Sequence, residues 1–275
     1  MALSQVNEVL DHALKVGLTS LNHVLSSKWL IQTESTNDEV KAFISQGLDG
    51  KSLAIVADFQ TMGKGTHGRV WKAPKASLLM TVGVPIDYPI VHARGLTLVI
   101  GVEVVNVLRR YNRDVKLKWP NDIWIGGSKV CGISCETAMS VDKRVYVVVG
   151  IGINIALDEK EKHLSNTSGY VPGALCQEVP DMESLTKMRL DLALQLIQNC
   201  RKEITEFSSN HLEKVRARWR DIDALNGQKA QFMTPDGKVF IGFIDGVDQY
   251  GQLKFTDDHR TYTFVDGTLR PLISD

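Results

Sequence analysis

Hydrophobic and polar positions change repeatedly between helical and extended spacing in the chain up to residue 155. Apolar residues at helical spacing over 6–14 predict an amphipathic helix that ends near Gly17. A second helix is predicted from Thr36 to Gly47, because Thr36 and Glu39 have the spacing of a capping box. The other elements predicted in this part are strands over 54–59, 77–86 and 145–155, a helix over 92–110, and a hairpin over 122–136 that turns at Gly126-Gly127.

The pattern changes again toward the C terminus. Apolar side chains recur at helical spacing from Asp181 to about Trp219 and predict helical structure with a charged opposite side. After Leu225 come short β-rich runs separated by turn residues, over 230–233, 239–244, 253–255 and 262–265. Such runs predict a small all-β barrel. We therefore predict two domains, residues 1–224 and 225–275.

The composition is that of an ordinary globular protein. The chain has 275 residues, of which 43% are hydrophobic and 23% charged, and its 32 basic residues equal its 32 acidic ones. A net charge of zero argues against a dedicated nucleic-acid-binding protein. The longest charge-free apolar stretch, residues 145–157, is shorter than the about 20 residues that a membrane-spanning helix needs. We therefore expect neither nucleic acid nor a membrane among its partners.

The N-terminal residues and the cysteines bear on the cellular compartment. Residues 1–28 contain Glu8 and Asp11 and lack the apolar core of a secretion signal, so we expect a cytoplasmic location. The alternative is a longer precursor that carries a targeting leader. The four cysteines form no CxxC pair and no zinc-ligand spacing with histidine, which favours reduced thiols over disulfides or a bound metal.

A glycine-rich segment with basic residues, Gly63-Lys64-Gly65-Thr66-His67-Gly68-Arg69, follows the strand predicted over 54–59. Glycine lets backbone N–H groups converge on an anion, and the lysine and arginine add positive charge. The sequence of this segment also matches the G-x-G-x-x-G motif of a dinucleotide-binding fold. That fold needs a helix here, whereas the chain runs past Pro74 into the strand predicted over 77–86. A kinase glycine loop is rejected because the other kinase motifs do not follow.

Two further clusters place lysines beside other polar groups. The segment Lys116-Leu117-Lys118-Trp119-Pro120-Asn121-Asp122 gathers cations, an aromatic ring, an amide and a carboxylate around a proline-stiffened turn. The same spacing is also that of a surface turn whose polar side chains bond the local backbone. Lys129 begins an apolar strand in which Gly132 would let a ligand approach the backbone, although an ordinary hairpin cation has the same pattern.

Taken with Ser35-Thr36-Asn37, Gln60 and the strand Gly150-Ile151-Gly152-Ile153-Asn154, these segments resemble the biotin protein ligases, also called holocarboxylase synthetases. The resemblance extends from about Lys28 to the C terminus in one order. It implies an α+β fold, in which a mixed β-sheet with flanking helices, similar to the class II aminoacyl-tRNA synthetases, precedes a small SH3-like β-barrel. It also implies an enzyme whose substrates are biotin and ATP, with Mg²⁺.

The resemblance also implies a role for individual residues. The biotin-binding positions would be Ser35, Thr36, Asn37, Gln60, Gly63, Lys64, Gly65, Thr66, Lys129, Gly132 and Gly152. The nucleotide-binding positions would be Lys64, Gly65, Thr66, His67, Gly68, Arg69, Trp71, Asn121, Lys129 and Asn154. The catalytic positions would be Lys129, Arg69, Lys118 and Asp122, and Asp122 would also assist Mg²⁺. Ile133 and Ile153 would form apolar walls for the valerate tail of biotin.

The implied reaction has two halves. The carboxylate of biotin attacks the α-phosphorus of ATP, and a lysine of an acceptor then attacks the resulting biotinyl-5'-AMP. The implied acceptor is biotin carboxyl carrier protein or another apo-carboxylase domain, and the enzyme would be a monomer or a weak homodimer. A lipoate protein ligase is the nearest alternative. A non-catalytic biotin sensor or DNA-bound repressor is an alternative of a different class.

One departure from the family pattern concerns the glycine-rich segment. The commonest form of the family has arginines where this chain has Lys64, Thr66 and His67. Lysine cannot form the planar two-pronged contact of arginine, so we expect a looser hold on phosphate and on the adenylate.

Overall fold

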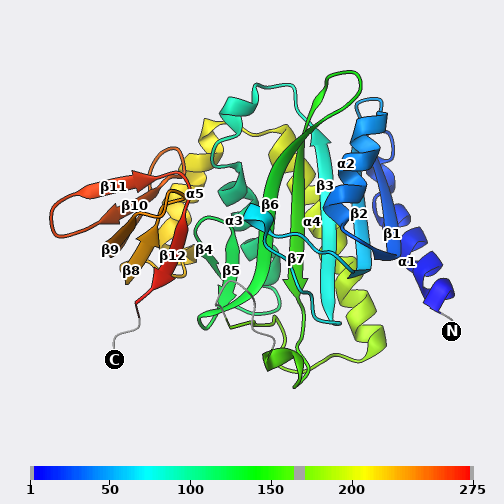
Figure 1. Cartoon of the computed structure of the whole chain (residues 1–275). Helices are drawn as coiled ribbons and strands as arrows, with labels where there is room; N and C mark the ends of the chain where they lie inside the picture. The colour runs from blue at the N-terminus through cyan, green and yellow to red at the C-terminus, as the bar shows by residue number, and fades with distance from the viewer. Residues whose placement is uncertain (1–2, 164–170, 273–275) are drawn as a thin grey trace.

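The computed structural model describes residues 3–163 and 171–272, and it shows a large mixed sheet beside a smaller antiparallel one (Figure 1). Within those residues the large sheet has seven strands in the order β1-β2-β3-β7-β6-β5-β4. β1 and β2 run parallel, and the other neighbouring pairs run antiparallel. The strands are β1 (Leu25–Thr33), β2 (Ser52–Gln60), β3 (Ser77–Pro85), β4 (Lys116–Lys118), β5 (Asp122–Ile125), β6 (Ser128–Met139) and β7 (Val145–Asn154).

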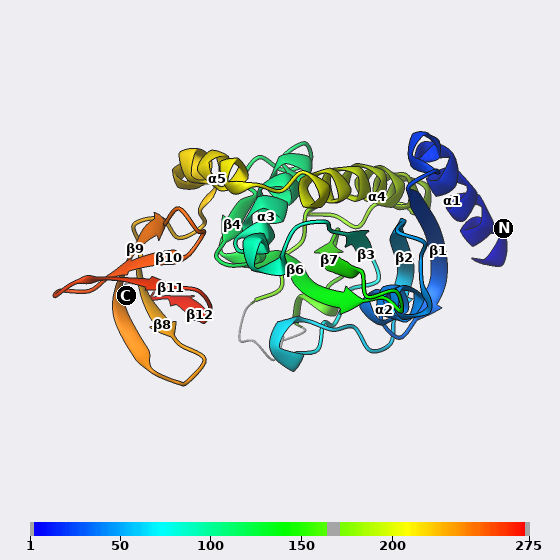
Figure 2. The ribbon, with the colours of Figure 1, turned by 90° about the horizontal axis from the view of Figure 1, so that it is seen from above.

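Helices cover the two faces of this sheet unequally. Viewed from above, α1, α3 and α4 lie along one face, and α2 lies on the other (Figure 2). The larger apolar core fills the first face, and a smaller cluster that includes Val40 and Ile44 lies under α2. The second face is therefore only partly covered, and its remaining area carries the candidate site. The helix bounds are α1 (Leu3–Gly17), α2 (Thr36–Gln46), α3 (Leu96–Leu108), α4 (Met182–Thr205) and α5 (Ser209–Ile222).

The central strands explain why the predicted apolar runs were continuous. β3 is buried at every residue from Ser77 to Val84, and β7 is buried at most of its positions. A strand that is covered on both faces has no solvent-facing positions to alternate with, so it reads as an unbroken hydrophobic run. These two strands form the rigid centre of the sheet beneath the site.

The smaller sheet follows α5. Within the described chain it has five antiparallel strands in the order β11-β10-β9-β8-β12. Its core contains Phe232, Phe255 and Phe264, whose ring centroids lie 4.0 to 6.2 Å apart. Trp119 attaches it to the large sheet by donating from Nε1 to the carbonyl oxygen of Gly251 at 3.1 Å. The strands are β8 (Lys229–Met233), β9 (Val239–Val247), β10 (Leu253–Thr256), β11 (Thr261–Phe264) and β12 (Thr268–Pro271).

The predicted fold class, a mixed sheet with flanking helices followed by a small β unit, is confirmed. The exact division between residues 224 and 225 stays a prediction.

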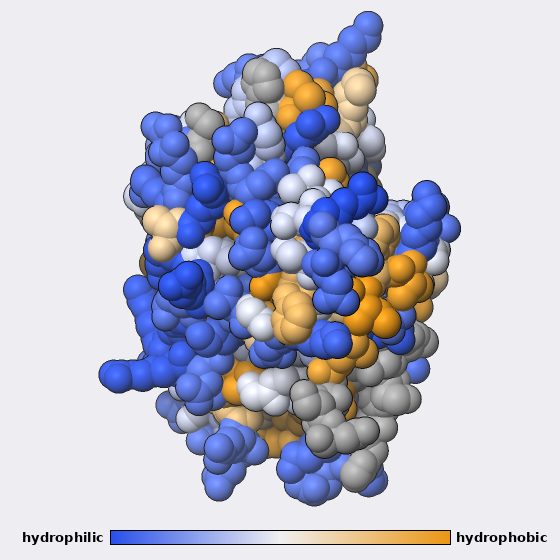
Figure 3. Space-filling model, turned by 90° about the vertical axis from the view of Figure 1, so that its left-hand side faces the viewer, coloured by the Kyte–Doolittle hydropathy of each residue, from blue (hydrophilic) through white to orange (hydrophobic). Residues whose placement is uncertain are grey.

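Figure 3 views the molecule from the side of the smaller sheet, where most of the visible surface is hydrophilic and apolar side chains form separate patches. Within residues 3–163 and 171–272, no helix combines the length and apolarity that crossing a bilayer requires.

The structure differs from the sequence predictions in three places. The helical region predicted over 181–219 is divided into two helices between Thr205 and Ser209. The strand β1 was not predicted. The capping box of Thr36 and Glu39 does not form, because the Thr36 hydroxyl bonds Gln60 and Thr81 instead.

Candidate active site

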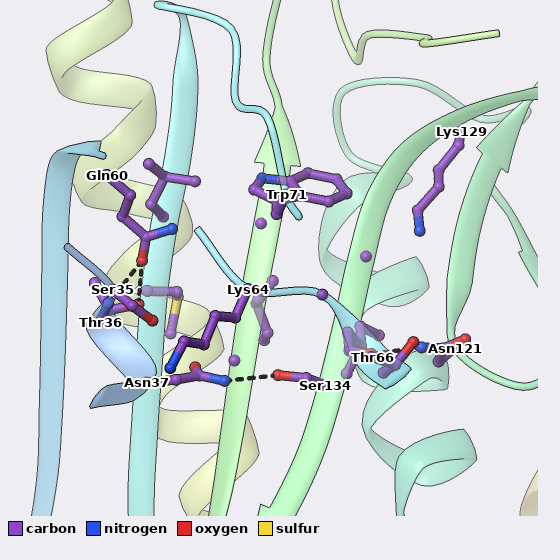
Figure 4. Close-up of a pocket in the computed structure, with 18 residues that line it drawn as sticks. Ser35, Thr36, Asn37, Gln60, Lys64, Thr66, Trp71, Asn121, Lys129 and Ser134 are labelled. Carbon is purple, nitrogen blue, oxygen red and sulfur yellow. Dashed lines mark hydrogen bonds between the residues drawn. The ribbon is translucent and has the colours of Figure 1, made fainter. Parts of the chain in front are cut away.

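A small cavity of about 50 Å³ lies on the partly covered face of the sheet, beneath the loop that joins β2 to β3. We call residues 61–76 of this connection the glycine loop. Figure 4 shows polar side chains of α2 and β2 at one end of the cavity and Lys129 at the other. Twelve predicted site residues line it: Ser35, Thr36, Asn37, Gln60, Lys64, Gly65, Thr66, Trp71, Asn121, Lys129, Gly132 and Gly152.

The first turn of α2 forms one end of the cavity through a connected set of hydrogen bonds. The backbone N–H and the hydroxyl of Thr36 both donate to Oε1 of Gln60, at 2.7 and 2.9 Å. Thr81 donates to Oδ1 of Asn37 at 2.6 Å, and Asn37 donates to Oγ of Ser134 at 3.1 Å. Thr36, Asn37, Thr81 and Ser134 are all buried. This end therefore presents paired donors and acceptors, which suits a polar ring with both kinds of group.

Two of these residues were missed by sequence reasoning. Thr81 lies inside the apolar run of β3, and Ser134 lies two residues after Gly132 on β6. Both are cross-strand partners of Gly150 on β7. The available signal was a hydroxyl within an otherwise apolar buried strand, because a buried hydroxyl needs a hydrogen-bond partner.

The floor of the cavity is a flat surface made by two glycines. Gly132 of β6 and Gly152 of β7 are cross-strand partners, and the indole of Trp71 lies against both. A Cβ atom at Gly152 would come within 2.7 Å of Cε2 and Nε1 of Trp71. Nε1 of Trp71 is buried and has no hydrogen-bond partner among the described residues. The glycines thus allow a close approach to the backbone, and Trp71 occupies that place in this structure. The approach of a ligand to Gly132 stays a prediction.

The other end of the cavity adjoins a cluster of opposite charges from three neighbouring strands. Nζ of Lys129 lies 2.5 Å from Oδ1 of Asp122, and Nζ of Lys118 lies 3.7 Å from Oδ2 of the same carboxylate. Burial lowers the pKa of Lys118, and the charge of Asp122 opposes that change. Lys129 also lies over the Trp71 ring, 5.3 Å from its centroid. Two lysines on one carboxylate leave this cluster with an excess positive charge.

The residues of this cluster do not fit a resident metal ion. The carboxylate of Asp122 is engaged by two ammonium groups. No group of three or more His, Cys, Asp or Glu side chains that could hold a metal occurs in the part of the chain that the structure describes. The predicted role of Asp122 beside Mg²⁺ therefore gains no support from its surroundings, and we treat Mg²⁺ as part of the nucleotide substrate.

The glycine loop folds back on itself above the cavity. The N–H of Gly65 donates to the carbonyl of Arg69 at 2.8 Å, and the N–H of Trp71 donates to the carbonyl of Gly63 at 2.8 Å. A Cβ atom at Gly63 would lie 2.5 Å from the carbonyl oxygen of Trp71, so only glycine fits there. Lys64 forms an ion pair with Asp38 at 2.7 Å. The Arg69 guanidinium is exposed and bonds within the loop.

The remaining predicted residues are distributed around the cavity. Gly63, Gly68 and Arg69 line a second, open cavity of about 890 Å³ that also reaches Val265. Lys118 and Asp122 lie behind Lys129 and do not line the first cavity. Asn154 is also absent from its lining, and its Nδ2 donates to the carbonyl of Gly173 at 3.0 Å. Ile153 does not line it either, whereas Ile151 does. The side chain of His67 falls outside the described part of the structure.

The fold and the cavity together define a class of protein in which a mixed sheet carries a polar site with a cluster of lysines beneath a glycine-rich loop. The family model described as the Biotin/lipoate A/B protein ligase family matches residues 29–154. The Bifunctional ligase/repressor BirA of Salmonella typhimurium is 30% identical over 227 residues, which are 82% of this chain and 68% of that protein. The chain belongs to the biotin protein ligase family, as its motifs predicted.

Two further comparisons agree with this assignment. The Biotin--[acetyl-CoA-carboxylase] ligase of Mycobacterium tuberculosis is 28% identical over 242 residues, which cover 86% of this chain and 85% of that protein. Among solved structures, the biotin protein ligase from Aquifex aeolicus in complex with biotin and ATP has a TM-score of 0.65 at 22% identity. That match covers 90% of this chain and 99% of the other. At this identity the likeness supports the fold.

Proposed function

We propose that this protein joins biotin to a lysine of a biotin-dependent carboxylase domain, using ATP and passing through biotinyl-5'-AMP. The observation that carries the proposal is the arrangement of the first cavity. Paired hydrogen-bond donors and acceptors lie at one end of the cavity, and the positive cluster of Lys129, Lys118 and Asp122 adjoins the other end. Biotin has a polar ureido ring at one end and a carboxylate at the other.

The polar end would bind the ureido ring. An N–H and a carbonyl of that ring require an acceptor and a donor, and Asn37, Thr36 and Ser134 offer both kinds of group in a buried setting. Ile133 and Ile151 would pack against the apolar part of the molecule. This placement leads the carboxylate of biotin toward Lys129.

The cationic end would bring two anions together. The biotin carboxylate and the ATP triphosphate repel each other, and the reaction moves further negative charge onto phosphate oxygens. Lys129 contacts the cavity directly, whereas Lys118 is buried behind it and contributes through its charge. The carboxylate oxygen forms a bond to the α-phosphorus, and pyrophosphate leaves. A neutral acceptor amine then attacks the carbonyl carbon, AMP leaves, and the nitrogen loses a proton.

The glycine loop must move before biotin can bind. Pockets that hold small ligands are usually about 300–1,000 Å³, whereas the first cavity is only about 50 Å³ while Trp71 and Lys64 lie over it. Opening of the loop would free the glycine floor. The orphaned Nε1 of Trp71 would then be able to donate to a ligand or to water.

The second cavity is the approach that we propose for the acceptor lysine. It shares Lys64, Gly65 and Asn121 with the first cavity, so the two cavities adjoin each other. Its wall also includes Val265 and Asp266 of the smaller domain, which would place both domains beside the acceptor.

A cytoplasmic location and a monomeric or weakly dimeric state remain our predictions, which cell fractionation and sedimentation would check.

Mass spectrometry tests this function and its nearest alternative together. The purified protein is mixed with Mg·ATP and either biotin or lipoate, with and without an apo-carboxylase acceptor domain. We expect biotinyl-AMP without the acceptor and a biotinylated lysine with it. Lipoate should be rejected strongly, because its dithiolane ring has no N–H or carbonyl group with which to join the buried hydrogen-bond network of Thr36 and Asn37. Lipoyl transfer at a rate comparable to biotinyl transfer would overturn the assignment.

A further inference from the structure

The two ends of the glycine loop lie where β2 and β3 separate. The pairing of these strands runs from Leu53 opposite Gly83 to Ala57 opposite Leu79, and it stops there. Asp58 follows on β2, and residues 75–77 precede the paired residues of β3. We call Asp58 the first stem of the glycine loop and residues 75–77 its second stem. Helix α4 packs across β3 and β2 on the face of the sheet opposite α2.

Arg189 of α4 bonds to both stems. Its Nε donates to the carbonyl of Ser77 at 2.7 Å, and its Nη2 donates to the carbonyl of Lys75 at 2.6 Å. Its Nη1 lies 3.5 Å from Oδ1 of Asp58, which also accepts a hydrogen bond from Trp29. Arg189 is 7% exposed. A buried guanidinium is stable only where its donors are met, and here the groups that meet them belong to the loop stems.

The second stem is held from other directions as well. The N–H of Lys75 donates to Oε1 of Glu161 at 2.9 Å. The carbonyl of Ala76 accepts from the N–H groups of Ile155 and Ala156, at 2.8 and 3.1 Å. The backbone from Lys75 to Ser77 is therefore fixed by side chains and strands that are distant in sequence.

The tip of the loop is held differently. Its backbone bonds join Gly63 to Trp71 and Gly65 to Arg69, within the loop itself. Its link to α2 is the exposed pair of Lys64 and Asp38, and such pairs contribute little in water. A tip bonded mainly to itself can open as a unit, provided that its stems keep their place.

We propose that Arg189 is a positioning residue that fixes both stems of the glycine loop, so that the tip of the loop closes over the first cavity in one position. Glu161 assists at the second stem. Arg189 touches neither cavity, so its effect reaches the site through the loop. For its readout on bound adenylate this inference rests on the proposed function. Losing Arg189 should release the acyl-adenylate faster without slowing its formation to the same degree.

The test compares four variants with the wild-type protein by two measurements. Hydrogen exchange of residues 61–76, followed by mass spectrometry, reports the loop without requiring any activity. Single-turnover experiments measure the formation of biotinyl-AMP and its release into solution. The variants are Arg189→Met, Arg189→Lys, Glu161→Ala and the control Leu196→Ala. Leu196 is a fully buried residue of the same helix, so the control lowers stability and leaves the stem contacts in place.

We expect Arg189→Met to speed exchange in residues 61–76 and to raise biotinyl-AMP release by about tenfold or more, the effect of losing a charge-assisted hydrogen bond. The rate of biotinyl-AMP formation at saturating biotin should change by less than about threefold. The lysines that we assign to this step, Lys129 and Lys118, lie on the sheet and not on the glycine loop. Arg189→Lys keeps the charge but not the two-pronged contact and should fall between. Glu161→Ala should change both readouts in the same direction by a smaller factor.

Two outcomes would overturn the inference. One is a rate of hydrogen exchange in residues 61–76 that is unchanged in both Arg189→Lys and Glu161→Ala. These two variants keep the test decisive if Arg189→Met fails to fold. The other is an equal change in Leu196→Ala, which would mean that general loss of stability is the cause. If the wild-type protein forms no biotinyl-AMP, the proposed function fails, whereas the exchange measurements still decide whether Arg189 fixes the loop.

Discussion

Replacing Lys129 by alanine is the most direct test of the charge arrangement at the site. Lys129 and Lys118 face the single carboxylate of Asp122, so the cluster carries a net charge of about +1 when all three are ionised. Without Lys129 the remaining pair is neutral and no longer attracts the biotin carboxylate or the α-phosphate. One unit charge at about 4 Å in a medium of effective dielectric constant about 20 is worth about 4 kcal/mol.

That magnitude agrees with the cost of removing one preorganised donor from a transition state, about 3 to 4 kcal/mol. We therefore expect Lys129→Ala to slow biotinyl-AMP formation by about 100- to 1,000-fold. The measurement is biotin-dependent pyrophosphate release at saturating Mg·ATP. Lys129→Arg should recover only part of the rate, because the planar guanidinium does not match the position of the ammonium group.

A matched control is available on the first helix. Lys15 of α1 is an exposed lysine that forms an ion pair with Asp11, and it lies outside both cavities. Lys15→Ala should leave the rate unchanged. Half or more of the wild-type rate in Lys129→Ala would refute the reasoning, because the cluster would then not be the source of the attraction.

Three further predictions concern the floor, the domain contact and the response to pH. In Gly152→Ala the new Cβ would stand on the floor, where it meets the indole of Trp71 at 2.7 Å. A ligand that takes the place of Trp71 would meet the same methyl group, so we expect KM for biotin to rise about tenfold. An unchanged KM would show that biotin does not approach this part of the floor. In Trp119→Phe the hydrogen bond to Gly251 is lost, and urea denaturation should show a free energy of unfolding lower by about 1–2 kcal/mol. Burial raises the pKa of Asp223 from 3.8 to about 6. The folded carboxyl then keeps a proton that the unfolded chain releases, so this group's contribution to stability should fall by up to about 3 kcal/mol as pH rises from about 4 to 6. Asp223→Asn should lack that fall, and an identical pH dependence in the variant would contradict it.

Much of the large sheet was predictable because its central strands are buried on both faces. β3 and β7 read as continuous apolar runs, and the β5–β6 hairpin turns at two glycines with positive φ, as predicted. β1 was missed because it is an edge strand in which buried and exposed residues follow no strict alternation. Its strand character depends on its pairing with β2, which is a tertiary fact. The break between α4 and α5 was missed because no glycine or proline marks it.

The site was predictable where a residue type has few structural alternatives. Gly132 could be assigned because glycine in a buried strand indicates close approach of another group. Gly152 was implied by the family resemblance, and the two glycines form the floor. Thr81 was missed because its neighbours on the strand are apolar, and its role arises only when α2 packs on β3 and brings Asn37 beside it. The hydrogen bonds from Arg189 to the stems of the glycine loop could not be predicted either, since 112 residues separate Arg189 from Ser77.

The positions of the cations separate the chemistry of the site from the retention of its intermediate. Lys118 and Lys129 belong to the rigid sheet, whereas Lys64 belongs to the glycine loop and pairs with the exposed Asp38. An exposed pair is worth at most about 1 kcal/mol, or about fivefold. We therefore expect Lys64→Ala to speed release of biotinyl-AMP by up to about fivefold while its formation changes less, and Lys64→Arg to slow release through a two-pronged phosphate contact. A Lys64→Ala enzyme that forms the adenylate as slowly as Lys129→Ala would show that the loop supplies catalytic charge, and the division between sheet and loop would be wrong.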